Sequence, residues 1–182
     1  MHCAELHSRE RWHMPSGYRI RRAVAGDEGH WVTVEVAAGE FRDEDSAWQR
    51  MTQNFGSFAT TDDAVFLLES PDGDVIGTAT ATTDEFEGRR QGQVGWVGIA
   101  PKYQGQGLAK PLLATVVNEL ANRGWKEAFL TTQTTSWRAV GLYLGFSFKP
   151  ALRPGTPDEA RGWQMVAKEL GSRWPESSGI QG

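Results

Sequence analysis

The sequence predicts an α/β protein in which strands and helices alternate around one central sheet. Three patterns predict this class: two β-rich segments joined by a turn at 64–83, an apolar segment at 93–99, and an amphipathic helix that begins near Leu108. The chain has 182 residues, which corresponds to one domain at roughly 150 residues per domain.

The domain organisation is simple, because the chain shows neither internal repeats nor low-complexity tracts. Residues 1–16 and 171–182 are polar and lack a sustained hydrophobic period. We therefore expect a flexible leader at 1–16, one folded domain at 17–170 and a flexible tail at 171–182.

The composition excludes several classes of protein. Lys and Arg number 19 against 23 Asp and Glu, for a net charge of −4, so we expect no nucleic-acid partner. No apolar run approaches the roughly 20 residues of a membrane span, and no secretory signal is visible, which favours a cytoplasmic protein with no membrane partner. Cys3 is the only cysteine, and the histidines lack ligand spacing, so we expect neither an internal disulfide nor a metal site.

The first half of the chain predicts one strand, two helices and a hairpin. Residues 18–24 have the pattern of a short strand, and Asp27 is placed to cap a helix that runs to Ala38. A second helix is expected over 44–53, because its apolar residues recur at spacings of three and four. The segments 64–69 and 75–83 are β-rich and flank turn residues, which predicts the hairpin.

The second half begins with a segment, 93–99, that is apolar on both faces and therefore predicts a central strand. Gly95 and Gly98 interrupt this strand, and glycines inside a strand often mark a bulge or a close approach to the backbone. The helix that starts near Leu108 has Pro111 in its first turn and ends at Gly124. We expect the remaining elements to be a strand at 125–132, a helix at 136–145, and strands at 146–150 and 162–170.

A glycine-rich loop, Gln104–Ala109, joins the central strand to this helix. Such a loop leaves successive backbone N–H groups free at the positive end of the helix dipole, which predicts an anion site. The spacing does not fit a dinucleotide fingerprint, which would need Gly or Ala where Lys110 stands, and it does not fit a Walker loop. A nucleotide-binding domain that uses the same glycines remains the weakest reading.

The loop does fit the pattern Q-x-x-G-x-A, and here the sequence resembles the GNAT family of N-acetyltransferases. A second family segment, commonly A-I-x-L-Y-x-x-x-G-F, aligns with residues 139–148 without a gap. The resemblance extends over about 18–170 and rests on both motifs together, since either alone would be weak.

The resemblance implies a central, mostly antiparallel sheet with a splayed strand pair, flanked by helices. It implies acetyl-CoA as cosubstrate, with its pyrophosphate on the loop and its pantetheine arm between the strands 94–99 and 128–132. Tyr143 aligns with the tyrosine that stands near the departing sulfur as general acid. The residues that the resemblance assigns to cosubstrate binding are Val97, Ile99, Gln104, Gly105, Gln106, Gly107, Leu108, Ala109 and Ser136.

The sequence departs from the family pattern at two positions. Ser136 stands where the family usually has Asn, and Ser147 stands where it usually has Gly. Ser147 therefore implies a turn that does not need a positive φ, or a strained turn.

The general base is not identified, because the segment 91–99 contains no carboxylate where many relatives have a Glu. Nearby candidates are Glu69, Asp84, Glu85 and Glu87. A further acidic group surrounds the junction of the first two helices, where it attracts a cationic amine or forms a solvated polar face; its members are Glu35, Glu40, Asp43, Glu44 and Asp45.

The expected function is N-acetyl transfer from acetyl-CoA to a small-molecule or peptide amine by direct attack. A covalent enzyme intermediate is not expected, because Cys3 is the only thiol. The alternative is an acyl-CoA-binding regulatory module with weak or no activity. The family resemblance also implies a homodimer, whereas the amine itself does not follow from the fold.

Overall fold

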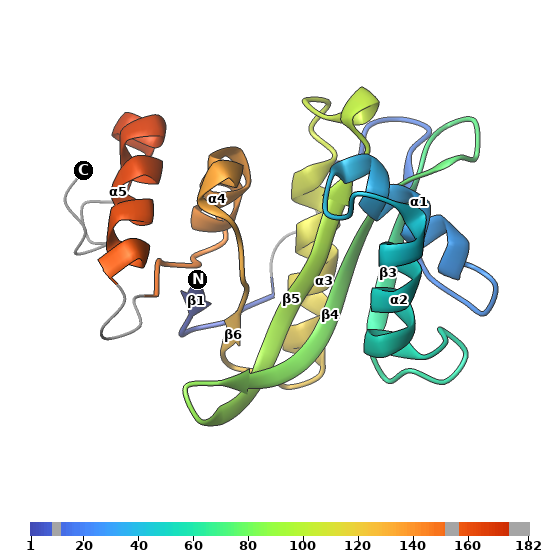
Figure 1. Ribbon diagram of the computed structural model, residues 1–182, viewed down its shortest axis with the longest axis horizontal. Helices are drawn as coiled ribbons and strands as arrows, with labels where there is room; N and C mark the ends of the chain where they lie inside the picture. The colour runs from blue at the N-terminus through green and yellow to red at the C-terminus, as the bar shows by residue number, and fades with distance from the viewer. Residues whose placement is uncertain (9–11, 152–156, 175–182) are drawn as a thin grey trace.

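A computed structural model describes residues 1–8, 12–151 and 157–174 and shows one six-stranded sheet in the order β1-β6-β5-β4-β3-β2 (Figure 1). Neighbouring strands are antiparallel except β5 and β6, which are parallel. The strands are β1 (His2–Cys3), β2 (Arg19–Arg22), β3 (Ala64–Glu69), β4 (Val75–Phe86), β5 (Arg89–Ile99) and β6 (Ala128–Phe129).

Helices cover both faces of the sheet. The α-helices are α1 (Glu28–Ala38), α2 (Glu44–Phe55), α3 (Ala109–Asn122), α4 (Trp137–Leu144) and α5 (Pro157–Leu170). Short 3₁₀ turns are η1 (Pro101–Tyr103), η2 (Thr134–Ser136) and η3 (Gly171–Arg173). Within the described ranges, no helix combines the length and the hydropathy that a membrane span needs.

The sheet separates two hydrophobic cores because side chains along a strand alternate between its faces. Phe66 and Leu68 of β3 pack on the α3 side. Val65 and Leu67 pack on the opposite side, against α1 and α2. The alternation confirms the predicted hairpin, in which β3 and β4 pair from Ala64 opposite Ala81.

Two elements at the sheet edge differ from the sequence prediction. Instead of opening a flexible leader, His2–Cys3 form β1 and pair with β6, with Cys3 buried. The predicted strand at 146–150 is reduced to one bridge, in which Lys149 exchanges backbone hydrogen bonds with His2. The chain's first residues thus form an edge of the sheet, because Met1, Cys3 and Leu6 carry enough apolar surface to join the core.

The predicted strand at 162–170 is wrong, since these residues belong to α5. The buried side chains of α5 follow the helical spacing of three and four residues and are Trp163, Val166, Ala167 and Leu170. Figure 1 shows α5 beside α4. The predicted strand at 125–132 is also shorter than expected, because only Ala128–Phe129 pair as β6. Most of the tail at 171–182 lies outside the described residues.

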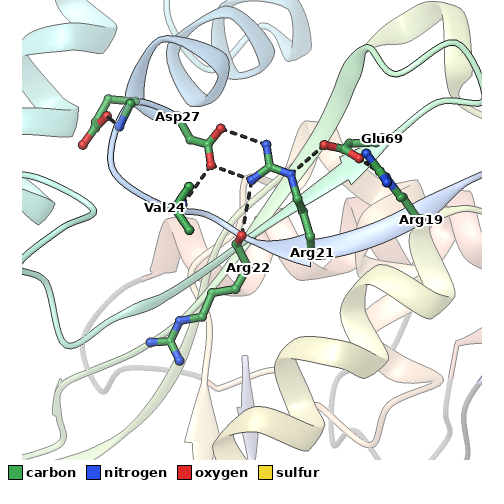
Figure 2. A network of polar contacts seen from close by, with 8 residues as sticks. Arg19, Arg21, Arg22, Val24, Asp27 and Glu69 are labelled. Carbon is green, nitrogen blue, oxygen red and sulfur yellow. Dashed lines mark hydrogen bonds and ion pairs between the residues drawn. The ribbon is translucent and has the colours of Figure 1, made fainter.

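An arginine holds β2 to the start of α1 (Figure 2). The two terminal nitrogens of Arg21 donate to the Asp27 carboxylate at 2.5 and 2.8 Å, and its Nε donates to Glu69 at 2.6 Å. Asp27 stands at the N-cap of α1 as predicted. Its side chain accepts from Val24 N and Arg21 instead of capping the helix N–H groups.

We expect Arg21→Ala to lower the free energy of unfolding by about 3 kcal/mol, because it leaves the Asp27 carboxylate, 9% exposed, without its cation and the Glu69 carboxylate, 5% exposed, with Arg19 alone. Hydrogen bonds from Arg21 lower the pKa of both Asp27 and Glu69. The wild-type advantage is therefore present at neutral pH and is lost as the pH falls through these lowered values. Urea unfolding at neutral and acidic pH measures it.

Arg22→Ala is the matched control for this prediction. The side chain of Arg22 is 54% exposed, and its approach to Glu119 is 3.9 Å. Its removal should change stability by no more than about 0.5 kcal/mol. Equal losses in the two variants would contradict the role assigned to Arg21.

Candidate functional site

An extra residue in β5 opens the sheet. Thr78 of β4 pairs with Gly98, but Thr80 pairs with Gly95, so β5 holds one residue more than β4 in this interval. Trp96 takes up the difference with a left-handed φ of 51°. This bulge confirms the irregularity that Gly95 and Gly98 predicted.

Beyond the bulge, β5 has a free edge. Its pairing with β6 ends at Gln93 opposite Phe129, and the two strands diverge from there. The N–H of Ala100 donates to Ile76 on the β4 side. Because backbone groups alternate along a strand, the N–H groups of Val97 and Ile99 face the gap. A ligand in this gap can therefore bond to β5 as an added strand would.

The predicted anion loop lies directly after this edge, at the start of α3. Gly105 and Gly107 have left-handed φ values of 76° and 80°, a conformation that glycine adopts without steric cost. In the part of the chain that the structure describes, the N–H groups of residues 105–109 have no hydrogen-bond partner. These N–H groups, at the positive end of the α3 dipole, fit a pyrophosphate.

Side chains of the loop anchor it and leave its backbone available. The Gln104 amide donates to the Ile99 carbonyl at 2.8 Å, and the Tyr18 hydroxyl donates to Gln106 at 2.8 Å. Leu108 is buried in the core. Lys102 and Lys110 are exposed on either side of the loop and add positive charge.

A cleft of about 640 Å³ lies over the gap and reaches across to α2. Both diverging segments line it, with Gly95, Trp96 and Val97 on one side and residues 131–133 on the other. Its charged lining residues are the acidic Glu40, Asp63 and Asp84 and the basic Arg50. The cleft thus carries an excess of negative charge.

Tyr143 of α4 lines the same cleft and is 7% exposed. Burial, with the nearby charges of Glu40 and Glu35, raises the pKa of its hydroxyl to about 12. The hydroxyl is therefore neutral at physiological pH and keeps its proton available for a hydrogen bond.

The two departures from the family pattern lie around α4. Ser136 stands at the N-cap of α4, where its side chain makes no capping hydrogen bond, and it does not line the cleft. Ser147 has a φ of 69°, so of the two alternatives the structure shows the strained turn.

The nearby acidic residues separate in the structure. Asp43 caps α2 by accepting from Ser46 N, while Glu44 and Asp45 are exposed in its first turn. Glu69 binds Arg21, and Glu85 and Glu87 lie toward the β4–β5 turn. Of the candidate bases near β5, Asp84 lines the cleft.

Glu35 is the residue whose role the sequence left open, and it is fully buried on α1. Its Oε1 lies 3.2 Å from the position that a Cβ on Gly98 would occupy, so its carboxyl rests against β5. Burial, reinforced by the charge of Glu40, raises its pKa to about 8. Its spacing of four from the buried Trp31 was the one sequence signal that it faces inward.

Comparisons with known proteins agree with this arrangement. Residues 21–146 match the model of the acetyltransferase (GNAT) family. A mycothiol acetyltransferase from Saccharomonospora viridis is 32% identical over 145 residues, covering 73% of this chain and 47% of that protein. N-acetyltransferase 8B of Mus musculus is 30% identical over 112 residues, covering 60% of this chain and 47% of that protein. The chain spans about half the length of the curated relatives it matches.

A solved structure of the aminoglycoside N-acetyltransferase AAC(6')-Iy in complex with CoA has the same fold. Its TM-score is 0.62 at 21% identity, over 77% of this chain and 94% of that one.

The buried Glu35 carboxyl makes stability depend on pH. Its pKa is about 8 in the native state against an ordinary value of 4.5, so between these values the native state binds one proton more than the unfolded state. Stability from this group therefore falls as the pH rises. We expect the free energy of unfolding of Glu35→Gln to increase relative to that of the wild type by about 3 kcal/mol as the pH rises from about 5 to about 9. Urea unfolding across this pH range measures the difference.

The other groups facing Glu35 do not provide this dependence. β4 and β5 present Thr78, Thr80 and Gly98 to it, and the buried residues of α2 are uncharged. Glu44→Gln, the same change at an exposed position, is the control and should follow the wild type. If the free energies of unfolding of Glu35→Gln and the wild type changed in parallel with pH, Glu35 would not be the group that makes stability depend on pH.

Proposed function

The chain belongs to the GNAT family of acetyltransferases, since the family model matches more than half of it, and we propose that it transfers an acetyl group from acetyl-CoA to a cationic small-molecule amine. The observation that carries the proposal is that β5 lines the cleft together with Tyr143 along its free edge and leads at its end into the glycine-rich loop. We assign the activity to the folded domain predicted at 17–170, to whose sheet β1 adds an edge strand.

The cosubstrate site is built from backbone N–H groups of the glycine-rich loop and of β5 that are available to a ligand. The N–H groups of 105–109 bind the pyrophosphate, and Lys102 and Lys110 add long-range attraction. Val97 and Ile99 bind the pantetheine arm through the free edge of β5. A β5 N–H near Ile99 polarises the thioester carbonyl. Gln104, Gln106 and Leu108 hold this backbone in place. Acetyl-CoA supplies the activated acyl group when bound.

Tyr143 stabilises the departing sulfur. With a pKa of about 12, its hydroxyl is a weaker acid than a thiol, whose ordinary pKa is near 8.5. Full proton transfer from Tyr143 to a free thiolate would therefore be uphill by about 5 kcal/mol. Tyr143 consequently donates a hydrogen bond to the thiolate as the C–S bond breaks.

The acceptor is a cation, because the cleft holds Glu40, Asp63 and Asp84 against the single Arg50. Attack is direct: Cys3, the only cysteine, is buried in β1 at the edge of the sheet and does not line the cleft. Peptide acceptors, a homodimer and a cytoplasmic location stay predictions of the family resemblance.

Calorimetric titration with acetyl-CoA, with ATP as the control ligand, tests the cosubstrate site. We expect saturable one-to-one binding of acetyl-CoA only. A screen of polyamines, aminoglycosides and neutral amines with thiol detection then tests transfer, and cationic amines should react fastest. Binding without turnover would favour the regulatory module, and preference for ATP would favour a nucleotide-binding domain.

We expect Gly107→Val to abolish detectable acetyl-CoA binding in the same calorimetric assay. A branched side chain at φ 80° is strained, and it projects where the pyrophosphate approaches the loop. Gly124→Val is the matched control, because Gly124 has a φ of 87° at the opposite end of α3. Retained affinity in Gly107→Val would refute the assignment of the loop.

Tyr143→Phe should lower kcat by about 10²-fold while leaving the Kd for acetyl-CoA within about twofold. The phenyl ring keeps the packing against Phe148, and only the hydrogen bond to the sulfur is lost. Steady-state thiol release and calorimetry measure the two quantities. An unchanged kcat would show that Tyr143 contributes only its packing against neighbours such as Phe148 and not a hydrogen bond to the sulfur.

A further inference from the structure

The reaction proposed above requires a proton acceptor that β5 does not provide. An amine is an ammonium ion at neutral pH and must lose a proton before its nitrogen can attack. Glu40 and Asp84 are exposed to the cleft, where they attract the cation. The buried carboxyl of Glu35, behind the bulge, has no role in binding and no ionic partner among the described residues.

Unpaired buried polar atoms gather at one place. Among the described residues, the buried side-chain atoms without a hydrogen-bond partner are both carboxylate oxygens of Glu35, Trp31 Nε1, and the hydroxyls of Thr78 and Thr80. All belong to the layer between the sheet and α1. Trp31 and Glu35 are one helical turn apart on α1, and Thr78 and Thr80 pair with Leu67 and Val65, which face α1 and α2.

The cluster continues into the cleft along β4. Thr82 follows Thr80 at the spacing of two that keeps side chains on one face, and Thr82 lines the cleft. Thr78, Thr80 and Thr82 thus form a threonine row from the cleft to the strand position opposite Gly98, where the Glu35 carboxyl lies. Gly95, opposite Thr80, also lines the cleft, and no atom lies within 4 Å of its missing side chain.

The spacing of this row suits water between its hydroxyls. Residues two apart in a strand are separated by about 6.6 Å, which is too long for a direct hydrogen bond and is spanned by one bridging water. Buried polar groups in folded proteins are nearly always satisfied by protein or ordered water. Glycine at 95 leaves room beside Thr80.

We propose that Glu35 accepts the proton of the acceptor ammonium through the hydroxyls of the threonine row and the waters between them. The N–H bond of the ammonium breaks, each hydroxyl or water passes a proton onward, and an O–H bond forms on Glu35. The freed nitrogen lone pair attacks the thioester carbon, and the C–S electrons stay on sulfur. The second nitrogen proton reaches the thiolate, and Glu35 returns its proton to solvent between turnovers.

The electrostatics of the site agree with this role. A pKa near 8 matches a group that takes a proton at neutral to mildly basic pH, and the negative charge of Glu40 increases its basicity. The charges of Glu35 and Glu40 also act on Tyr143, which places Glu35 within electrostatic reach of the reacting end of the cleft.

The test compares Glu35→Gln with Glu44→Gln and the wild type, using the amine that the wild type turns over best. We expect Glu35→Gln to lower kcat by about 10²-fold, to keep the Kd for acetyl-CoA within about twofold, and to lose the rise of kcat centred near pH 8. Glu44→Gln should keep that rise. Thr80→Val, which removes one relay hydroxyl at constant shape, should lower kcat about tenfold.

Two further measurements separate proton transfer from structure. An acceptor that is already deprotonated at neutral pH, such as an arylamine or an alkoxyamine, should recover most of the activity of Glu35→Gln. The ¹³C carboxyl resonance of Glu35 in the protein without cosubstrate should titrate near pH 8. An unchanged rate and pH profile in Glu35→Gln would overturn the inference, whereas a wild type without turnover on any amine would overturn the proposed function.

Discussion

The backbone of Trp96 is the constraint on which the rest of the site depends. A bulky residue with left-handed φ costs on the order of 1–3 kcal/mol, and the surrounding packing has to hold it. The indole ring lies edge-on to Trp31 at 5.2 Å and stacks on Phe41 at 5.7 Å. This aromatic group fixes the bulge, which in turn separates β5 from β6 and directs the chain toward the glycine-rich loop.

The two faces of the sheet contribute different groups to the site. The α3 face is an apolar core that fixes the loop through Leu108 and the start of the helix. The α1 face combines an aromatic group with the buried polar atoms of Glu35 and the threonine row. The cleft lies along the free edge of β5, and the lining residues Thr82 and Gly95 connect it to the α1 face.

Local sequence patterns predicted much of this arrangement. They did not predict the contacts between residues that lie far apart in the chain. The hairpin, the bulged strand, the loop and Tyr143 each depend on residues close together in the chain. β1 is two residues long and finds its partner at the far end of the sequence, which no local pattern encodes. The helix at 162–170 was misassigned although Trp163, Val166 and Leu170 carry the helical period. The orientation of Glu35 needed the packing of α1 on β5 to become visible.

The position of β1 also sets an order for folding. His2 pairs with Phe129 and Lys149, so this edge of the sheet forms only after the chain has been synthesised well beyond its middle. Contacts between such distant residues carry a large loop-closure cost and form slowly. The β3–β4–β5 meander joins segments that are close in the chain, whereas the burial of Met1, Cys3 and Leu6 depends on residues that are synthesised much later.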